Sequence, residues 1–460
     1  MLETIKVLRP QILDKNYDVL DFGELNDNPF NNQRTIQFAI DSVSSLGGGH
    51  LYLIPGVFET GPIEIKSGVD LVIPRNCYLK FIKKHEFYKP AIFDYEGKQA
   101  IRCNSPIKIW NAKNVMISGN GIIDGCGYYW RPCKTWKITT KDLEKREKIS
   151  KFFIESKESK IWYPTESSYQ GALIGVDNIS IEDADKYWDL FRPVLISIYK
   201  SERVMLKDIT SSNSPAWNIH PLFSNELTFD SVKVKNEYSA QNGDGIDIES
   251  CKNVEVLNSL FEVGDDGICI KSGKNREARQ IKVPSENIYI HDNLVYHAHG
   301  GIVIGSEMSR GVRNLFAQNN TFIGTDVGLR FKSAIGRGGV VENLHFDNIY
   351  MSDILGEAII FDLGYSLYKM DHEKTDDVAA IDEEDVPYFK DITIANIKIN
   401  GAKTFLKING INKDTVSNIH IENVSFKAEE FLNIKNCSNI RLVNVTNNND
   451  INVENEIFNK

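Results

Sequence analysis

Residues 253–267 read NVEVLNSLFEVGDDG, and residues 287–301 read NIYIHDNLVYHAHGG. Each stretch opens with asparagine, continues with apolar residues at alternate positions, and ends in a turn that contains glycine. Apolar residues at every second position are typical of β-strands with one buried face. Similar phrases recur on both sides of these two stretches, so repetition decides the fold.

Each repeated phrase begins at an anchor residue, and most successive anchors lie roughly 21 to 34 residues apart. This spacing is the length of one turn of a β-solenoid. A single coil cannot bury its apolar face, and asparagines at equivalent positions favour stacking because in-register amides hydrogen-bond between coils. The sequence therefore predicts an all-β fold, a single right-handed parallel β-helix. A β-sandwich or barrel is the alternative on pattern alone. The anchors are Asn114, Arg203, Glu226, Asn253, Asn287, Asn314, Asn343, Asp391, Asn418 and Asn439.

Two segments interrupt the repeat within what we predict to be one domain, residues 1–460. Residues 17–50 are expected to form an N-terminal strand and a capping helix over 33–45, which would cover the open end of the solenoid. The main catalytic coils are expected at 200–445. The helix is predicted because four apolar residues share one face, namely Ile36, Ala39, Ile40 and Val43.

The second interruption, residues 128–189, is an aromatic-rich insertion with an amphipathic helix expected near 141–154. Long insertions of this kind are more often binding loops than linkers. A purely structural flap is the alternative. The aromatic residues that define the insertion are Trp130, Trp136, Trp162, Tyr163 and Tyr169.

Bulk properties restrict the partners. The net charge of −10 argues against nucleic acid and anionic membrane surfaces. No apolar run is long enough to span a bilayer, and no secretory leader is visible, so a cytoplasmic location is favoured unless a leader was removed. The seven cysteines include no CxxC pair, which favours reduced thiols over disulfides or a zinc site. The oligomeric state stays open.

Charged motifs fall in consecutive coils of the middle. NGDG places Asp244 at one turn, and GDDG places Asp265 and Asp266 about one coil later. In a regular strand the two adjacent aspartates point to opposite faces, but the flanking glycines permit a bend that aims both at one site. His299 follows in AHGG, and Arg330 and Lys332 share one strand face further along. Stacking predicts an acidic hydrolytic centre beside a cationic anchor for a substrate carboxylate.

These motifs, NxDG, GDDG, HGG with IVIGSE and RxK, resemble in this order the polygalacturonase family, glycoside hydrolase family 28. The opening YDVLDFGE (17–24), the GGG after the helix and TGPIEIKS (60–67) extend the likeness over nearly the whole chain. Two positions depart from the family pattern. Ala298 replaces the usual glycine before the histidine, and Leu355-Gly356-Glu357-Ala358 stands where endo-acting members usually carry a substrate-contacting tyrosine.

The resemblance implies hydrolysis of α-1,4-galacturonosidic linkages in polygalacturonate or pectin oligosaccharides. It implies that Asp265 is the general acid, that Asp244 and Asp266 hold and activate water, and that His299 tunes the acid. Arg330 and Lys332 would bind a galacturonate carboxylate, and Lys271, in IKSG, is expected to reach an adjacent subsite. The scheme requires no metal and no cofactor. Inversion is expected because carboxyl groups about 6.5–9.5 Å apart leave room for water.

Other functions remain open at this point. A calcium-dependent pectate lyase on the same fold is one alternative, a hydrolase of rhamnogalacturonan-type pectin is another, and a non-catalytic carbohydrate-binding solenoid is a third. Among hydrolases, we expect action from chain ends, because residues 128–189 can close one end of the groove and their aromatics can stack on a terminal sugar. The stretches VIGSEM and RGGVVEN also resemble bacterial exo-acting members.

Overall fold

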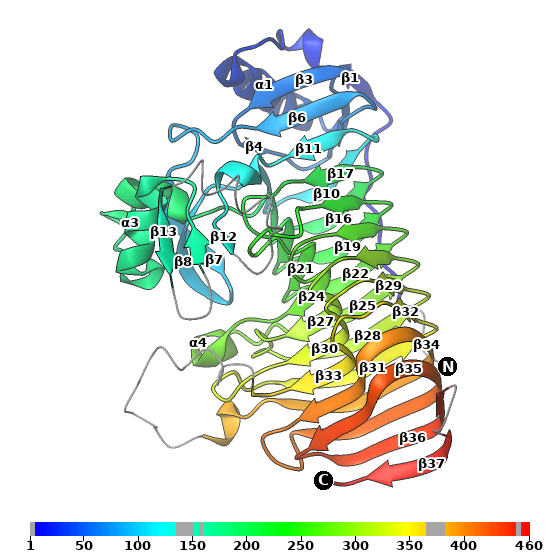
Figure 1. The fold of residues 1–460 in the computed structure, drawn as a ribbon. Helices are drawn as coiled ribbons and strands as arrows, with labels where there is room; N and C mark the ends of the chain where they lie inside the picture. The colour runs from blue at the N-terminus through cyan, green and yellow to red at the C-terminus, as the bar shows by residue number, and fades with distance from the viewer. Residues whose placement is uncertain (1–4, 135–150, 156–159, 365–381, 448–451) are drawn as a thin grey trace.

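The computed structural model describes residues 5–134, 151–155, 160–364, 382–447 and 452–460. These residues form a long parallel β-helix whose coils stack along one axis (Figure 1). Three stacks of parallel strands, called A, B and C below, make the walls, and the predicted parallel β-helix is confirmed.

Stack A carries the turns and strands that bear the charged motifs. Its strands are β4 (Ile63–Glu64), β9 (Ile107–Trp110), β15 (Ile196–Tyr199), β18 (Ile219–Leu222), β21 (Ile246–Glu249), β24 (Ile268–Lys271), β27 (Gly300–Gly305), β30 (Val327–Lys332) and β33 (Glu357–Asp362). Stack B contains β1 (Asn16–Asp18), β2 (Gly49–Tyr52), β5 (Val69–Val72), β10 (Lys113–Ser118), β16 (Glu202–Lys207), β19 (Asn225–Asp230), β22 (Lys252–Leu257), β25 (Ser285–His291), β28 (Val312–Gln318) and β31 (Val340–Asp347).

Stack C contains β3 (Gly56–Thr60), β6 (Cys77–Phe81), β11 (Ile122–Asp124), β17 (Thr210–Ser212), β20 (Lys233–Lys235), β23 (Leu260–Glu262), β26 (Leu294–Tyr296), β29 (Thr321–Ile323) and β32 (Tyr350–Ser352). Four long strands complete the C-terminal coils, namely β34 (Tyr388–Asn409), β35 (Val416–Lys435), β36 (Ser438–Asn447) and the antiparallel β37 (Asn452–Phe458).

The inward-facing residues of the three stacks form one apolar core along the axis. Equivalent side chains pack on one another from coil to coil. Phe331 and Phe361, for example, stack with ring centroids 4.2 Å apart in adjacent strands of stack A. Each large apolar side chain that is fully buried contributes about 1.5–3 kcal/mol. This repetition explains why alternate apolar residues in the sequence predicted the fold.

The asparagine anchors form the expected ladder. The side-chain amide of Asn287 donates to Asn253, Asn314 donates to Asn287, and Asn343 donates to Asn314, at 2.9, 3.2 and 2.6 Å. All four have positive φ, between 55° and 57°. Asparagine tolerates this left-handed conformation better than most residues, and its side chain then continues the bonding between coils. Asparagine therefore serves both the turn and the stack.

The N-terminal end is covered by α1 (Pro29–Ser45), at the blue end of Figure 1. Ile36, Ala39, Ile40 and Val43 are buried, which confirms the predicted face. The helix begins earlier than predicted because Asn28 caps it and accepts from Phe30 N–H, with Pro29 in the first turn.

Residues 5–15 run along the outside of the coils toward β1 (Figure 1). Leu8 N–H donates to Glu226 at 2.6 Å, and Gln11 N–H donates to Asn114 at 3.1 Å. The Arg9 guanidinium contacts Thr228 and Glu255. This N-terminal strap therefore touches β19 and β22 and the start of β10, three strands of stack B that come much later in the chain.

A side module projects beside the N-terminal coils of stack A (Figure 1). It contains the hairpin β7 (Pro90–Tyr95) and β8 (Lys98–Cys103), which sequence reasoning did not find. The insertion adds β12 (Cys133–Lys134), β13 (Phe153–Glu155), β14 (Lys160–Trp162), α3 (Glu166–Ile174) and a 3₁₀ helix, Ala184–Leu190. Most of the helix predicted over 141–154 lies outside the described residues. The prediction is wrong for the last two residues of that range, because Phe153 and Ile154 pair with β14 as a strand.

All seven cysteines are buried free thiols, as predicted. None of the helices in the described part of the chain is long and apolar enough to cross a membrane. The compartment expected from the sequence stays a prediction.

Candidate active site

The charged motifs meet because they occupy equivalent turns of stack A. Asp244 precedes β21, Asp265 and Asp266 precede β24, and His299 precedes β27. These strands are in register, with Ile246 beside Ile268 and Ile268 beside Ile302. Residues from successive coils are therefore neighbours on one ridge of the molecule.

Three carboxylates converge on this ridge. One carboxylate oxygen each from Asp244, Asp265 and Asp266 lies within 4.8 Å of the others. Residues 264–267 are not a regular strand, so Asp265 and Asp266 both reach the cluster, as the flanking glycines predicted. Asp244 is 4% exposed and Asp266 is 1% exposed, whereas Asp265 is half-buried. Asp265 is therefore the member best able to reach a substrate atom.

Asp266 is held by both cations of the RxK motif. Lys332 Nζ lies 2.7 Å from Asp266 Oδ2, and Arg330 Nη1 lies 3.5 Å from Asp266 Oδ1. Burial by itself raises the pKa of Asp266, but the charges of Lys332 and Arg330 outweigh it and hold that pKa well below its usual range. The two cations thus keep Asp266 ionised. Their predicted contact with a substrate carboxylate stays a prediction.

Asp244 has the opposite environment. Burial, followed by the charge of Asp247 and those of Asp265 and Asp266, raises the pKa of Asp244 well above its usual value. Asp247, on β21, is a fourth acid that sequence reasoning missed. Neither of its carboxylate oxygens has a hydrogen-bond partner among the described residues, and burial raises its pKa as well. Two neighbouring carboxyls therefore take up protons more readily than Asp266 does.

His299 is oriented by a residue that the sequence analysis did not single out. Its Nδ1 lies 2.6 Å from Asp326 Oδ2, and its backbone N–H donates to the carbonyl of Asp265 at 2.9 Å. The Tyr238 hydroxyl donates to the other oxygen of Asp326 at 3.2 Å. Asp326 precedes β30 just as His299 precedes β27, so its place in the repeat was the available signal.

Lys271 is more deeply placed than expected. Its side chain is 5% exposed, and its ammonium lies 2.9 Å from Glu307 and 3.6 Å from Asp247. The same ammonium lies 4.9 Å from the centroid of the Trp217 ring. Lys271 thus balances buried carboxylates beside the cluster, and its predicted contact with an adjacent subsite stays a prediction.

The three clustered aspartates have the oxygen ligands that Ca²⁺ prefers. Their surroundings fit a cation poorly, because Lys332 and Arg330 already occupy both oxygens of Asp266. A divalent ion at this point must compete with two fixed positive charges. The charge arrangement therefore favours an acid–base site over a metal site.

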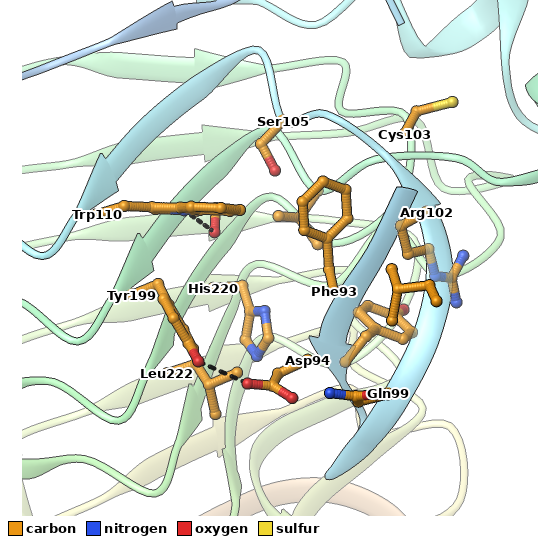
Figure 2. A pocket seen from close by; sticks show the side chains of 14 residues that line it. Phe93, Asp94, Gln99, Arg102, Cys103, Ser105, Trp110, Tyr199, His220 and Leu222 are labelled. Carbon is orange, nitrogen blue, oxygen red and sulfur yellow. Dashed lines mark hydrogen bonds between the residues drawn. The ribbon is translucent and has the colours of Figure 1, made fainter. Parts of the chain in front are cut away.

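The hairpin β7–β8 covers the floor of stack A on the N-terminal side of the cluster. Its Tyr95 packs on Trp217, with ring centroids 4.5 Å apart. At its tip, Glu96 Oε2 lies 3.6 Å from Lys274 Nζ. A cavity of about 270 Å³ lies beneath the hairpin, and Phe93, Trp110 and Tyr199 are among the residues that line it (Figure 2). The hairpin therefore covers the coils on this side of the cluster.

This covering element differs from the expected one. The aromatic-rich insertion was expected to close the groove and to stack on a sugar, but Trp130 and Trp162 are 1% and 2% exposed. Trp162 lines a separate cavity together with Tyr128, Tyr129 and Tyr163, so stacking of the insertion on a sugar stays a prediction. Tyr163 and Tyr169 are half-buried, and Trp136 lies outside the described residues. Hairpin 90–103, rather than the two tryptophans, forms the wall.

Comparison with known proteins gives consistent relatives. The model of glycosyl hydrolases family 28 matches residues 184–449. An exo-poly-α-D-galacturonosidase from Dickeya chrysanthemi is 28% identical over 86% of this chain and 64% of its own length. The chain thus spans a little under two thirds of that enzyme. An endo-polygalacturonase from Pectobacterium carotovorum is 29% identical over 83% of this chain and 80% of its own.

A solved structure is also similar. The exopolygalacturonase from Thermotoga maritima superposes with a TM-score of 0.78 and is 29% identical, over 98% of this chain and 96% of that chain. The similarity covers both the coils and the N-terminal part of the chain.

Proposed function

Because this chain belongs to glycosyl hydrolases family 28, we propose that it hydrolyses α-1,4-galacturonosidic linkages in polygalacturonate and its oligomers, acting from chain ends. The observation that carries the proposal is the cluster of Asp244, Asp265 and Asp266 with Asp266 held ionised by Lys332. A hydrolase needs carboxyl groups in different protonation states at one point, and this cluster provides them.

We assign the proton donor to Asp265. Its carboxyl is the most exposed of the three, so it can protonate the glycosidic oxygen as the bond to the anomeric carbon breaks. Water attacks that carbon, and its proton passes to Asp244, whose raised pKa makes it the stronger base once it is ionised. Asp266 stays charged and orients the water. Asp244 then releases its proton to solvent, and solvent protonates Asp265 again.

His299 lies beside the proton donor through its backbone bond to Asp265. Asp326 accepts from Nδ1 when that nitrogen carries the proton, which leaves Nε2 to face away from Asp326. We infer that His299 hydrogen-bonds near the scissile linkage and sets the protonation of the acids.

Inversion of the anomeric carbon stays a prediction. The 4.8 Å within which the cluster lies joins one oxygen of each aspartate and is not the separation of whole carboxyl groups that distinguishes inverting from retaining enzymes. A different argument supports inversion. Asp266 has both carboxylate oxygens bound to cations, which makes it a poor nucleophile. Proton NMR of the first-formed product decides between the two outcomes.

Action from chain ends is supported by the hairpin β7–β8, which covers the groove on one side of the cluster. Relatives of both exo and endo type exist, so the product pattern is the test. We expect mono- or digalacturonate to be the first product from polygalacturonate and from di- to hexagalacturonate. A rapid loss of polymer viscosity with mixed oligomers appearing first contradicts this assignment.

The calcium-dependent lyase is the second candidate, because the three aspartates are suitable ligands. A lyase releases unsaturated products, which absorb in the ultraviolet, and loses activity with a chelator. Chelator-resistant release of saturated reducing ends supports hydrolysis, and Asp265→Asn serves as the inactive control.

A further inference from the structure

Two arginines on the hairpin side of the cluster lack an acidic partner. Arg102 lies on β8, and Arg192 follows the 3₁₀ helix that ends the insertion. Arg102 Nη1 donates to the backbone carbonyl of Arg192 at 3.4 Å, which brings the two together. Neither forms an ion pair with a carboxylate in the described part of the chain. In a protein with a net charge of −10, two adjacent unpaired arginines require an explanation.

The bonds of Arg192 do not balance its charge. Its guanidinium donates to the carbonyls of Pro215 and Gln241 and to the side-chain oxygen of Asn242, each at 3.0 Å. All three acceptors are neutral. Burial and then the charge of Arg102 lower the pKa of Arg192 to about 10, so it remains a cation at neutral pH.

Arg102 also keeps donors available. Its guanidinium carbon lies 3.8 Å from the centroid of the Tyr95 ring, and among the described residues its guanidinium donates only through Nη1, to the carbonyl of Arg192. In Figure 2 Arg102 lies at the edge of the cavity, on the side opposite Trp110 and Tyr199. The guanidinium is thus fixed by stacking, with N–H groups left for a ligand.

The arginine pair is next to the acid cluster. Asn242, which Arg192 binds, stands two residues before Asp244, and its backbone N–H lies 3.3 Å from Asp265 Oδ2. Tyr95, on which Arg102 stacks, packs against Trp217, and the Lys271 ammonium lies over that indole. Continuous contacts therefore join Arg192 to Asp265 and Arg102 to Lys271.

We propose that Arg102 and Arg192 bind the carboxylate of the galacturonate unit on the hairpin side of the scissile bond. A guanidinium binds carboxylate through parallel N–H···O bonds, which fixes orientation as well as charge. The inference rests on the proposed function and goes beyond it by naming the anchor of the terminal sugar. With Arg330 and Lys332 engaged by Asp266, this pair supplies positive charge beside the cluster that no carboxylate of the described residues pairs with.

The test compares Arg102→Gln and Arg102→Lys on trigalacturonate, with Arg441→Gln as the matched control. Arg441 is exposed in the C-terminal coils and bonds Asn455, far along the chain from the cluster. We expect Arg102→Gln to raise KM about 10- to 100-fold while kcat changes less than about threefold, since a charge-assisted bond is lost in binding. Arg102→Lys should give an intermediate KM, because lysine keeps the positive charge but cannot form the two parallel N–H···O bonds of a guanidinium. Arg441→Gln should match the wild type.

Arg192→Lys is the second variant, because Arg192→Gln also removes the bonds that hold two turns of the chain. Thermal unfolding measured by circular dichroism shows whether each variant is folded. Wild-type KM in folded Arg102→Gln and Arg192→Lys overturns the inference while the proposed function stands. An equal rise of KM in Arg441→Gln also overturns it. A wild-type protein that releases no reducing ends from any galacturonan overturns both.

Discussion

Two pairs of cationic side chains flank the aspartate cluster, and they differ in what they touch. On the C-terminal side, Lys332 and Arg330 both contact Asp266. On the hairpin side, Arg102 and Arg192 contact a tyrosine ring and neutral oxygens. The two pairs carry the same charge but have different roles. A cation beside a buried acid fixes the protonation state of that acid, whereas a cation without an acidic partner is available to bind an anionic ligand.

If the bond is cleaved between the two pairs, at Asp265, then Asp265→Asn should have the largest effect of any substitution. We expect kcat to fall about 10²- to 10⁴-fold or more, because the leaving oxygen loses its proton donor while the fold is kept. Reducing-end release from polygalacturonate measures the loss. Wild-type turnover in a folded Asp265→Asn variant would remove Asp265 from the mechanism.

The C-terminal pair is tested by Lys332→Met. With Lys332 removed, the buried Asp266 keeps only Arg330, so its pKa rises from its lowered value. Asp266 must be ionised for activity, so the acidic limb of the rate profile should move to higher pH, and the fall in kcat/KM should correspond to a loss of about 2–5 kcal/mol of transition-state stabilisation. Arg102→Gln should leave the position of this limb unchanged. An unmoved limb in Lys332→Met would show that Asp266 does not titrate in turnover.

The stability of Lys332→Met should depend on pH in a defined direction. The pKa of Asp266 is lower in the folded state than in the unfolded chain, so its ion pairs stabilise the wild type above the unfolded pKa. That contribution disappears as the pH falls through the folded pKa. The difference in unfolding free energy between wild type and Lys332→Met should therefore be largest near neutral pH and shrink in acid, as chemical denaturation at several pH values can show.

Asp326→Asn tests a contact that belongs to neither pair. An amide cannot hold His299 Nδ1–H as a carboxylate does, so the ring loses its fixed proton position. We expect kcat to fall roughly 10-fold. Asp326→Glu should restore part of the rate, and Tyr238→Phe should cost less because Asp326 keeps its contact with His299. Wild-type kcat in a folded Asp326→Asn variant would contradict the positioning of His299 by Asp326.

A substitution at the tip of the hairpin β7–β8 is expected to change the overall rate of hydrolysis least. A Cβ at Gly97 would lie 2.3 Å from Gly273 Cα and Lys274 N, and the φ of Gly97 is +75°. Gly97→Val should displace the tip and uncover the groove, so longer oligomers should appear early and viscosity should fall faster. Gly336→Val is the control, because that glycine also has positive φ but open space around it. Identical product patterns in all three proteins would contradict closure by the hairpin.

The sequence predicted those parts of the site that repeat. Asp244, Asp265 and His299 were found because equivalent turns of stacked coils must be neighbours, whatever the loops do. Asp326 occupies the next equivalent turn and was missed because a single aspartate carries no motif. Asp247 was missed because its importance comes from burial, which a short strand pattern does not reveal.

The hairpin was missed for a different reason. Residues 90–103 do not follow the coil pattern, and their position depends on tertiary contacts with Trp217 and Gly273. The available signal was local: Glu96 and Gly97 both have positive φ in a two-residue turn, a combination that glycine at the second position favours. The many aromatic residues of the insertion led us to predict that Trp130 and Trp162 cover the groove, but both side chains are buried in packing.

The N-terminal strap has a consequence for how the molecule assembles and comes apart. Stacked repeats interact mainly with their neighbours and tend to fray coil by coil. Leu8 and Arg9 bond to residues more than 200 positions later, on β19 and β22, so these contacts form only after the coils between have stacked. We expect the strap to dock last during folding and to act as a latch that makes several coils open together. Removing residues 1–11 should then broaden the unfolding transition and speed hydrogen exchange in β16 and β19 before it affects β28.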